Sequence, residues 1–260
     1  VTFDALAGDR FLVAVAPTAA GQADVALQIF VSPTGATFPS ACQFALTFEP
    51  ATVTGNTVED QCNGTFTHSL FDGGKDTPPV AGDAPFPELG KATDLGLDAY
   101  FTGSGTIDAR ADFTVQFWVK WRGFDKDDIE NAWLFSDLDL DVGGKGGGGG
   151  LGLAITNPQL TPAQKLDITT CTNAEPLTFL DTTTDITANQ WTFIRMVQTG
   201  GSVYLCLDGA RKGTLPVAAP LLTSTYPPYL GRNAVWTPSG AFFNGEFDDF
   251  RVLTGALPCN

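Results

Sequence analysis

The stretch FTVQFWVKW (Phe113–Trp121) carries the pattern that decides the fold class of this chain. Apolar residues occupy every second position along it, which is the period of a β-strand with one buried face. The residues that share this face are Phe113, Val115, Phe117, Val119 and Trp121. Similar short apolar runs recur between clusters of Gly, Pro, Asn and Asp at residues 44–48, 132–135, 151–155, 191–198, 203–207 and 247–253. Many short strands separated by turn residues predict an all-β fold, an antiparallel β-sandwich.

The composition supports strands and turns and argues against several classes of function. The 260 residues include 29 acidic residues against 14 Lys and Arg, a net charge of −15, and 23 of the acids are Asp. Asp prefers turns and caps to helix interiors. Because phosphate contacts need clustered cations, we expect no nucleic-acid partner. Surplus loop aspartates favour calcium, a hard cation that takes oxygen ligands.

The sequence divides into an arm and a sandwich domain. Residues 1–37 hold two strand-like runs joined by the loop TAAGQAD, which predict an N-terminal β-hairpin. A hairpin is too small to be stable alone, so we expect it to pack on the sandwich of residues 38–260. Residues 72–90 lack any period and predict a long surface loop, and residues 161–166 are the best candidate for a short helix. No apolar run is long enough to predict a membrane span.

The cysteines indicate the compartment rather than a catalytic site. Five cysteines are widely spaced without a Cys-x-x-Cys pair, and His68 is the only histidine. This argues against zinc-ribbon, thioredoxin and Ser-His-Asp sites. Widely spaced cysteines in an acidic, Thr-rich chain predict an exported protein with disulfide bonds, either secreted or at the cell surface. His68 itself is expected in a surface loop.

Four segments of the second half carry a resemblance to a known family. They are FTVQFWVKW, QWTFIRMVQTGGSVYLCLDGARKG (190–213), YLGRNA (229–234) and FNGEFDDFRVLTGAL (243–257). Their common pattern is a core strand, a strand opened by Trp, a hairpin turned by Asp208-Gly209 and a last strand with an Asp pair. It resembles the laminin-G-like jelly roll of the concanavalin A-like lectin/glucanase superfamily. The resemblance implies a jelly-roll sandwich whose last strand lies beside the first.

More than one disulfide pairing is open. Cys171 and Cys206 both lie in strand-like runs and could be cross-strand partners. Cys42 opens the first strand and Cys259 follows the last, and the resemblance implies that these strands are neighbours. A Cys42–Cys259 bond would tie the chain ends together and leave Cys62 free. Cys62–Cys259 and Cys42–Cys62 are the competing pairs.

The acid pair Asp248-Asp249 marks a candidate metal position. Phe247 and Phe250 flank the pair, so one carboxylate should lie beside buried apolar side chains, which costs free energy unless the charge is compensated. The resemblance implies a structural calcium held by the first Asp of the pair, by backbone carbonyls and by acids near the opening strand. In this sequence the implied side-chain ligands are Asp248, Asp60 and Glu49. The alternative is a pair of solvent-facing acids.

The run SDLDLDV (136–142) is a second acidic pattern. In a strand, Asp137, Asp139 and Asp141 would project to one face, which suggests a second calcium site or a solvated acidic loop. The resemblance implies a third option, because retaining glycosidases of the superfamily carry two Glu on an alternating acidic strand, about 5 Å apart. Every acid here is the shorter Asp, so glycoside hydrolysis is the alternative function rather than the preferred one.

Aromatic residues in loops indicate where a ligand could bind, since stacking on a sugar needs an exposed ring. Trp236, Tyr226 and Tyr229 form the best such group, with closure of the sandwich edge by Tyr-Pro packing as the alternative. Aromatic residues inside the strand patterns are expected in the core. These are Phe117, Trp118, Phe135, Trp191 and Phe193.

The sequence therefore predicts an extracellular, calcium-stabilised recognition or adhesion module that binds a carbohydrate or an extracellular protein. No catalytic constellation is visible. The alternatives are a glycoside hydrolase that uses residues 137–141 and a structural spacer in a larger surface protein. We expect the sequence to be a fragment of a longer chain, and the isolated fragment to be a monomer.

Overall fold

The structure is a computed structural model of the chain. It describes residues 42–62, 64–70, 78–96, 99–124, 131–139, 149–156, 165–170, 178–217, 221, 223–234 and 242–259. All of them belong to the unit Ser40–Asn260. The predicted N-terminal hairpin and residues Asp141, Cys171 and Trp236 lie outside the described residues, and the division into arm and sandwich stays a prediction.

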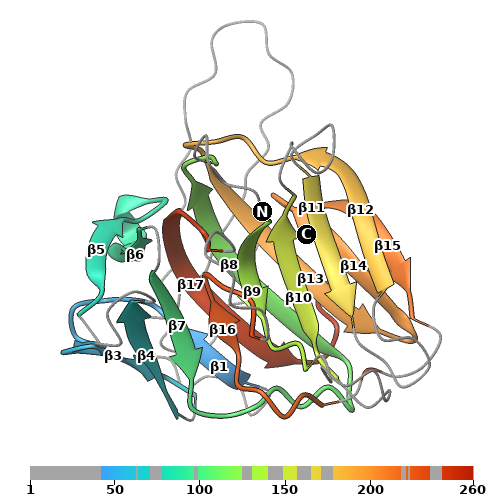
Figure 1. The fold of residues 1–260 in the computed structure, drawn as a ribbon, viewed down its shortest axis with the longest axis horizontal. Coiled ribbons are helices and arrows are strands. Elements are labelled where there is room, and N and C mark those ends of the chain that lie inside the picture. Colours follow the sequence, from blue (N-terminus) through green and yellow to red (C-terminus); the bar gives the residue numbers. More distant parts are fainter. Residues whose placement is uncertain are drawn as a thin grey trace, which may run out of the picture. The chain divides into compact units, whose positions relative to one another are not determined.

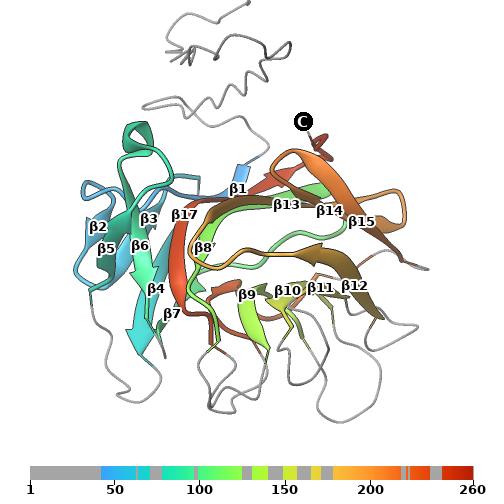
Figure 2. The ribbon, with the colours of Figure 1, turned by 90° about the horizontal axis from the view of Figure 1, so that it is seen from above.

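The described strands form two antiparallel sheets that face each other across the core, as Figures 1 and 2 show. The first, sheet A, has the order β15 (Ala210–Pro216), β14 (Ser202–Leu207), β13 (Trp191–Thr199), β8 (Phe113–Trp121), β17 (Gly245–Thr254), β6 (Lys91–Leu95), β5 (Val80–Asp83), with β1 (Cys42–Leu46) also on β17. The second, sheet B, has the order β12 (Thr178–Asp185), β11 (Lys165–Thr170), β10 (Leu151–Ile155), β9 (Ala132–Ser136), β16 (Tyr229–Leu230), β7 (Ala99–Gly103), β4 (Gly64–Leu70), β3 (Thr57–Asp60), β2 (Val53–Thr54). A 3₁₀ turn, η1 (Pro87–Leu89), precedes β6. The predicted all-β jelly-roll sandwich is confirmed.

Aromatic side chains from both sheets build the core. The alternating apolar residues of β8 are all buried, as predicted, at 0–1% exposure. The ring of Phe250 on β17 lies 6.0 Å from Phe66 and 5.9 Å from Phe135, both on sheet B. Burying a Phe side chain contributes about 1.5–3 kcal/mol, so this cluster supplies much of the free energy that holds the sheets together.

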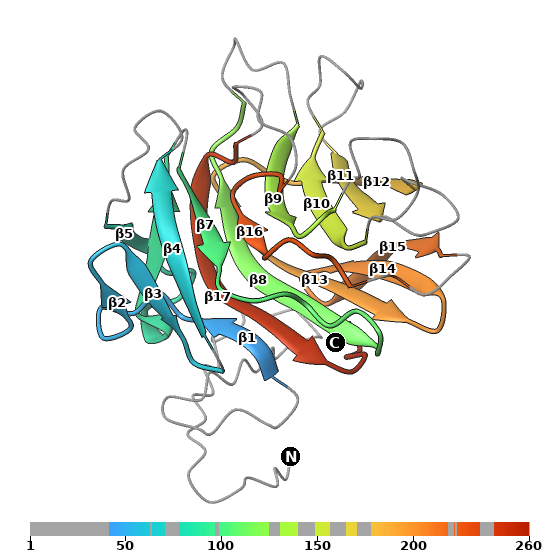
Figure 3. The same ribbon diagram turned by 60° about the horizontal axis from the view of Figure 1, so that its bottom comes forward.

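Strand β17 changes its neighbour half-way along. It pairs with β8 on one side over most of its length, while its other side pairs first with β6 and then with β1 (Figure 3). The register with β8 shifts between Asp248 and Arg251, and Asp249 has a φ of 49°. The predicted acid pair therefore sits in a β-bulge, which re-aims side chains at the point where β6 gives way to β1.

Most predicted strands are confirmed to within two residues, but three local predictions are wrong. The expected loop 72–90 contains β5, and the expected helix 161–166 overlaps β11. Both short segments gain their hydrogen bonds from a neighbouring strand, which local sequence does not reveal. His68 is not a surface-loop residue; it is 2% exposed in β4 and its ring lies 5.0 Å from that of Phe101.

The aromatic residues expected in the core are divided between the two faces of the sheets. Phe117 and Phe135 belong to the core cluster. Trp118, Phe193 and Trp191 do not, because strand alternation points them to the outer face of sheet A. Trp118 and Phe193 are nevertheless buried there, and their rings lie 5.1 Å apart. Strand residues that point away from the core can thus also be buried, where another segment of the protein covers that face of the sheet.

The disulfide bonds are Cys42–Cys62 and Cys206–Cys259, with Cα–Cα distances of 5.8 and 5.4 Å. The predicted pairs Cys42–Cys259 and Cys171–Cys206 are wrong, and the competing pair Cys42–Cys62 is confirmed. The turn after β3 lies against β1, where Gln61 N–H donates to the Ala45 carbonyl at 2.9 Å.

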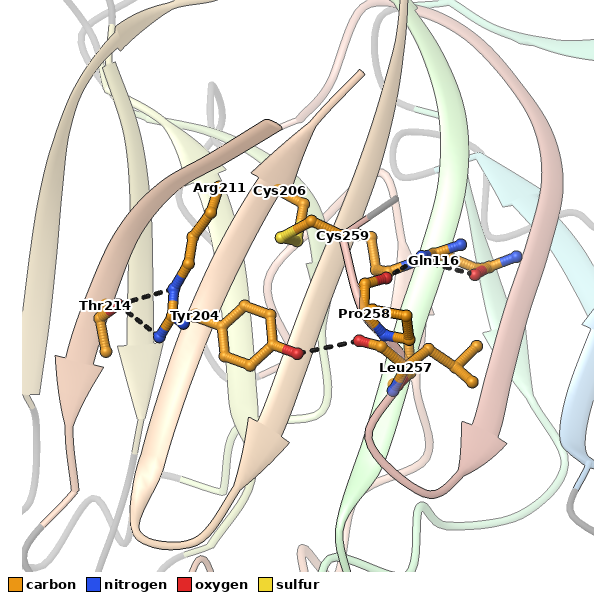
Figure 4. The surroundings of a disulfide bond; sticks show 10 residues. Gln116, Tyr204, Cys206, Arg211, Thr214, Leu257, Pro258 and Cys259 are labelled. Carbon is orange, nitrogen blue, oxygen red and sulfur yellow. Dashed lines mark hydrogen bonds between the residues drawn. A yellow bond between two sulfur atoms is a disulfide. The ribbon is translucent and has the colours of Figure 1, made fainter. Parts of the chain in front are cut away.

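The C-terminal segment explains the second bond. After β17 it turns back over sheet A, where Leu257 N–H donates to Thr114 Oγ1 and the Tyr204 hydroxyl donates to the Leu257 carbonyl at 2.9 Å. Figure 4 shows Cys259 reaching Cys206 beside this contact. The segment therefore covers part of the outer face of sheet A.

Candidate functional site

The outer face of sheet B carries a group of aromatic side chains that do not belong to the core. In β7, Ala99 and Phe101 are buried while Tyr100 and Thr102 point outward. In β16, Leu230 is buried and Tyr229, opposite Thr102, points outward. The rings of Tyr100 and Tyr229 lie 6.2 Å apart at 38° and both are partly exposed. Strand alternation thus places two tyrosine side chains side by side on the outer face of sheet B.

Arg232 joins these rings because of the glycine before it. Gly231 has a φ of +86°, and a Cβ there would lie 2.8 Å from Leu95 Cδ1. Only glycine satisfies both the turn and the close approach. The turn puts the Arg232 guanidinium carbon 4.5 Å from the Tyr100 ring centre and 5.4 Å from that of Tyr229. It also lies 5.9 Å from the ring of Phe242.

The third tyrosine extends this surface toward the acidic run. Tyr226 is 36% exposed, and its electrostatic interaction with Tyr229 shows that the two lie close together. Burial raises the pKa of Tyr229, while Arg232 opposes that shift. The preceding Thr225 donates its hydroxyl to the carboxylate of Asp139. We call Tyr100, Tyr226, Tyr229 and Arg232 the tyrosine–arginine platform.

The acidic run does not form the strand that its alternation predicts. Strand β9 ends at Ser136, so Asp137 and Asp139 lie beyond it. Asp137 is 2% exposed, and its Oδ1 accepts a hydrogen bond from Leu151 N–H at 2.7 Å. Burial raises the pKa of Asp137 to about 7. The Asp137 carboxylate thus links the end of β9 to the start of β10. Asp139 instead contacts Thr225, the residue before Tyr226 of the platform.

Asp248, the first predicted calcium ligand, is a buried and poorly satisfied carboxylate. It is 1% exposed, and Oδ1 accepts a hydrogen bond from Asp249 N–H at 2.7 Å. Within the described part of the chain, the buried Oδ2 has no hydrogen-bond partner. Burial, followed by the charge of Asp249, raises the pKa of Asp248 to about 8, and Glu49 acts in the same direction. The structure therefore brings Glu49 and Asp248 into electrostatic contact.

The carboxylates of the other two predicted ligands, Asp60 and Glu49, accept hydrogen bonds from backbone N–H groups. Asp60 Oδ1 accepts hydrogen bonds from Ala45 N–H at 2.7 Å and Cys62 N–H at 3.0 Å. Glu49 Oε1 accepts one from Lys91 N–H at 3.1 Å. Among the residues that the structure describes, no group of three or more acidic, His or Cys side chains is placed to hold a metal ion. Of the three predicted ligands, Asp248 suits a cation best, since its buried Oδ2 has no partner among the described residues.

A hollow of about 270 Å³ lies beside Glu49 at the β5 edge of sheet A, between the loop after β1 and strands β5 and β6. Its walls are mainly apolar, including Phe48, Val53 and Val80, with Lys91 at the side. A sugar site needs several polar groups that converge on the ligand. The hollow lacks them, whereas the platform offers hydroxyls, a guanidinium and aromatic rings together.

The family comparison matches the part of the chain that holds the platform and Asp248. A laminin-G family model, described as the concanavalin A-like lectin/glucanases superfamily, matches residues 94–258. The chain belongs to this superfamily. A comparison with curated proteins gives no match. Within the described residues, no helix is long and apolar enough to cross a membrane.

Solved structures with the same fold include carbohydrate-binding domains. Domain 4 of AbnA, a GH43 extracellular arabinanase from Geobacillus stearothermophilus, in complex with arabinotriose, has 19% identity and a TM-score of 0.57, covering 84% of this chain and 95% of that one. The binding domain of Paraclostridial Mosquitocidal Protein 1 has 14% identity and a TM-score of 0.61, covering 84% and 50%. The botulinum neurotoxin serotype D ligand-binding domain in complex with N-acetylneuraminic acid has 12% identity and a TM-score of 0.57, covering 84% of this chain and 48% of that one. This superfamily chain thus spans about half the length of the toxin domains, and the likeness concerns the fold.

Sequence reasoning found part of the platform and missed the rest. It selected Tyr226 and Tyr229 from a loop pattern, but not Tyr100 or Arg232, and it also did not select Trp133, which lies outside the platform. Trp133 is partly exposed on the outer face of β9. The alternation of AYFTG, with Tyr between two core residues, was the available signal for Tyr100. Nothing in the sequence indicates that Arg232 meets two tyrosines from different segments.

Proposed function

We propose that this domain is an extracellular carbohydrate-recognition module that binds its ligand on the tyrosine–arginine platform. The observation that carries the proposal is the group of partly exposed Tyr rings around Arg232 on the outer face of sheet B. A sugar presents an apolar face that stacks on aromatic rings and hydroxyls that need hydrogen-bond partners. The platform supplies both kinds of contact from two segments of chain.

Calcium, in this proposal, stabilises the fold at Asp248 rather than contacting the ligand. Asp248 and Glu49 would hold it, and the bound cation would neutralise their two charges at the bulge of β17. Its effect would be to join the loop after β1 to the last strand. The buried, unsatisfied Oδ2 of Asp248 and the raised pKa of this carboxyl support the proposal. A second calcium at Asp137, Asp139 and Asp141 has less support, because the Asp137 carboxylate already holds the backbone of Leu151.

An extracellular location agrees with the two disulfide bonds, which persist in oxidising compartments. It also agrees with the extracellular arabinanase among the fold neighbours. The adhesion function with a protein ligand and the spacer function are outcomes of the test below. Glycoside hydrolysis would require Asp137 as a reacting group, and this carboxylate is fully buried.

A glycan array probed with and without calcium tests the function. We expect binding to one class of glycans, reduced by Tyr229→Ala and Tyr100→Ala. Tyr204→Phe is the matched control, since Tyr204 lies on the outer face of sheet A, under Arg211. Binding that survives both Ala variants would place the ligand elsewhere. No binding to any glycan, with an intact fold, would contradict carbohydrate recognition and favour a protein partner or a spacer.

A further inference from the structure

Arg232 shares with Arg195 and Arg211 the lack of an acidic partner among the described residues, but those two donate a terminal N–H to the Pro258 carbonyl and to Thr214 Oγ1. Arg122 contacts Asp94 at 2.6 Å, and Arg251 contacts Asp249 at 2.7 Å. Arg110 pairs with Asp108 at 2.8 Å. Within the described part of the chain, Arg232 has no acidic partner. Its neighbours are aromatic rings and the carbonyl of Asn233, which accepts the Nε–H at 3.1 Å.

The two terminal nitrogens of this guanidinium are the important feature. Arg carries five N–H donors in one plane, and the contact with Asn233 uses the one on Nε. No hydrogen bond from Nη1 or Nη2 of Arg232 to another described residue is present, and the side chain is only partly buried. The Tyr100 and Tyr229 rings restrain the guanidinium, whose carbon lies 4.5 and 5.4 Å from their centres. A fixed guanidinium edge matches the two oxygens of a carboxylate.

The charge of the whole protein makes this arrangement informative. The chain has a net charge of −15, so acids are abundant, yet the described acids leave Arg232 unpaired. A single fixed cation among aromatic rings suits a ligand with one carboxylate and an apolar face. A polyanion such as a nucleic acid would need several cations and would be repelled by the surrounding negative field.

We propose that the platform selects sugars that carry a carboxylate, such as a uronic or a sialic acid, with Arg232 binding the carboxylate. This inference rests on the proposed carbohydrate-binding function and names its ligand class. Tyr229 and Tyr226 provide stacking surface next to the charge, so sugar rings and carboxylate are bound together. Arg232 is thus the specificity-determining residue and the tyrosines provide binding that is common to neutral and acidic sugars.

The test compares each acidic sugar with a neutral counterpart of the same size. Trigalacturonic acid and sialyllactose are each titrated against their own carboxyl methyl esters, by calorimetry with the whole chain. We expect the wild-type protein to prefer at least one acid over its neutral counterpart by about tenfold or more, as a charge-assisted bidentate contact requires. Arg232→Met should abolish that preference, and Arg232→Lys should reduce it because an ammonium cannot form the fork. Tyr229→Ala should weaken both sugars alike.

Arg211→Met is the matched control, because Arg211 also stacks on a tyrosine, 4.3 Å from the ring of Tyr204, but lies on sheet A. It should leave the preference unchanged. Equal binding of acidic and neutral sugars by the wild-type protein would overturn the role of Arg232 while leaving carbohydrate recognition intact. A preference that persists in folded Arg232→Met would overturn it as well. Binding of neither class, with no array signal, would overturn both proposals together.

Discussion

The outer face of sheet A carries a network of ion pairs that is not found among the described residues around Arg232 on sheet B, although Arg195 and Arg211 on sheet A also stack on rings. On sheet A, Lys120 and Arg122 contact Glu246 at 3.1 and 3.2 Å, and Arg122 also contacts Asp94. On sheet B, Arg232 contacts rings instead. A charge network of this kind holds strands β6, β8 and β17 together. The terminal N–H groups of Arg232 donate to no described residue and can therefore bind a ligand.

The two faces also differ in how they are covered. Phe86, beside η1, packs on Trp118 with ring centres 5.4 Å apart, and the C-terminal segment crosses β13 and β14. Trp118 and Phe193 on the outer face of sheet A are therefore buried and serve stability. The tyrosines of sheet B stay partly exposed. An aromatic residue on an outer strand face is therefore a binding candidate only where no other segment of the protein packs over that face.

Removing the disulfide bond that anchors the C-terminal segment should have the largest effect. Closing a loop of 53 residues, the Cys206–Cys259 bond contributes about 4 kcal/mol to the free energy of unfolding, against about 3 kcal/mol for Cys42–Cys62 with 20 residues. Chemical denaturation of Cys206→Ala/Cys259→Ala and Cys42→Ala/Cys62→Ala double variants measures both. A larger loss from the second variant would show that the covered face of sheet A matters less than its contacts indicate.

Neutralising the centre of the charge network should have the next largest effect. Glu246 is 6% exposed and contacts both Lys120 and Arg122. Glu246→Gln leaves two cations beside Asp94 alone, so we expect a loss of about 3 kcal/mol, typical of a broken buried ion pair. Asp108→Asn, in an exposed pair, is the control and should change stability little. Equal effects from both variants would remove the distinction between a structural and an incidental ion pair.

Calcium should stabilise the protein in a way that depends on pH. Folding raises the pKa of Asp248 from 3.8 to about 8, so in EDTA the folded state retains a proton that the unfolded state releases. Stability should therefore fall as the pH rises from about 4 to about 8 and level off above that. Calcium requires the deprotonated carboxylate, so it should bind more tightly at pH 9 than at pH 6, stabilising by about 2.7 kcal/mol at 100 times its Kd.

Asp248→Asn is the control for this titration, measured by thermal unfolding with calcium and with EDTA. It should lose the calcium response and the share of the decline that Asp248 contributes, while Asp137, whose pKa burial raises to about 7, keeps a decline between about pH 4 and pH 7. A wild-type melting temperature that is insensitive to calcium at every pH would refute the proposed site. A calcium response retained by the variant would place the ion elsewhere.

Arg232→Met should have the smallest effect on stability. A partly exposed cation–π contact contributes about 0.5–1 kcal/mol, and the Met side chain keeps most of the apolar contact with the rings. Denaturation of this variant beside Glu246→Gln compares the two faces directly. A loss as large as that of Glu246→Gln would assign Arg232 to the support of the fold rather than to ligand binding.

The sequence alone determined the fold class, the positions of most strands and the family resemblance. The alternation in Phe113–Trp121 is a local pattern that predicts a strand. The Asp208-Gly209 pair is a local pattern that predicts a tight turn, and both residues have positive φ in the structure. The sequence also predicted that one acid of the pair between Phe247 and Phe250 is buried, as Asp248 is, but it did not predict the β-bulge.

Only the tertiary structure decided the disulfide pairs, the burial of His68 and the grouping of Tyr100, Tyr229 and Arg232. Each depends on which segments become neighbours after folding, and contacts between residues far apart in the chain leave no periodic signal along it. The C-terminal segment brings Cys259 to Cys206, and pairing of β16 with β7 brings Tyr229 to Tyr100. Sequence periodicity fixes the face of a strand on which a residue lies, but strand order fixes what it meets there.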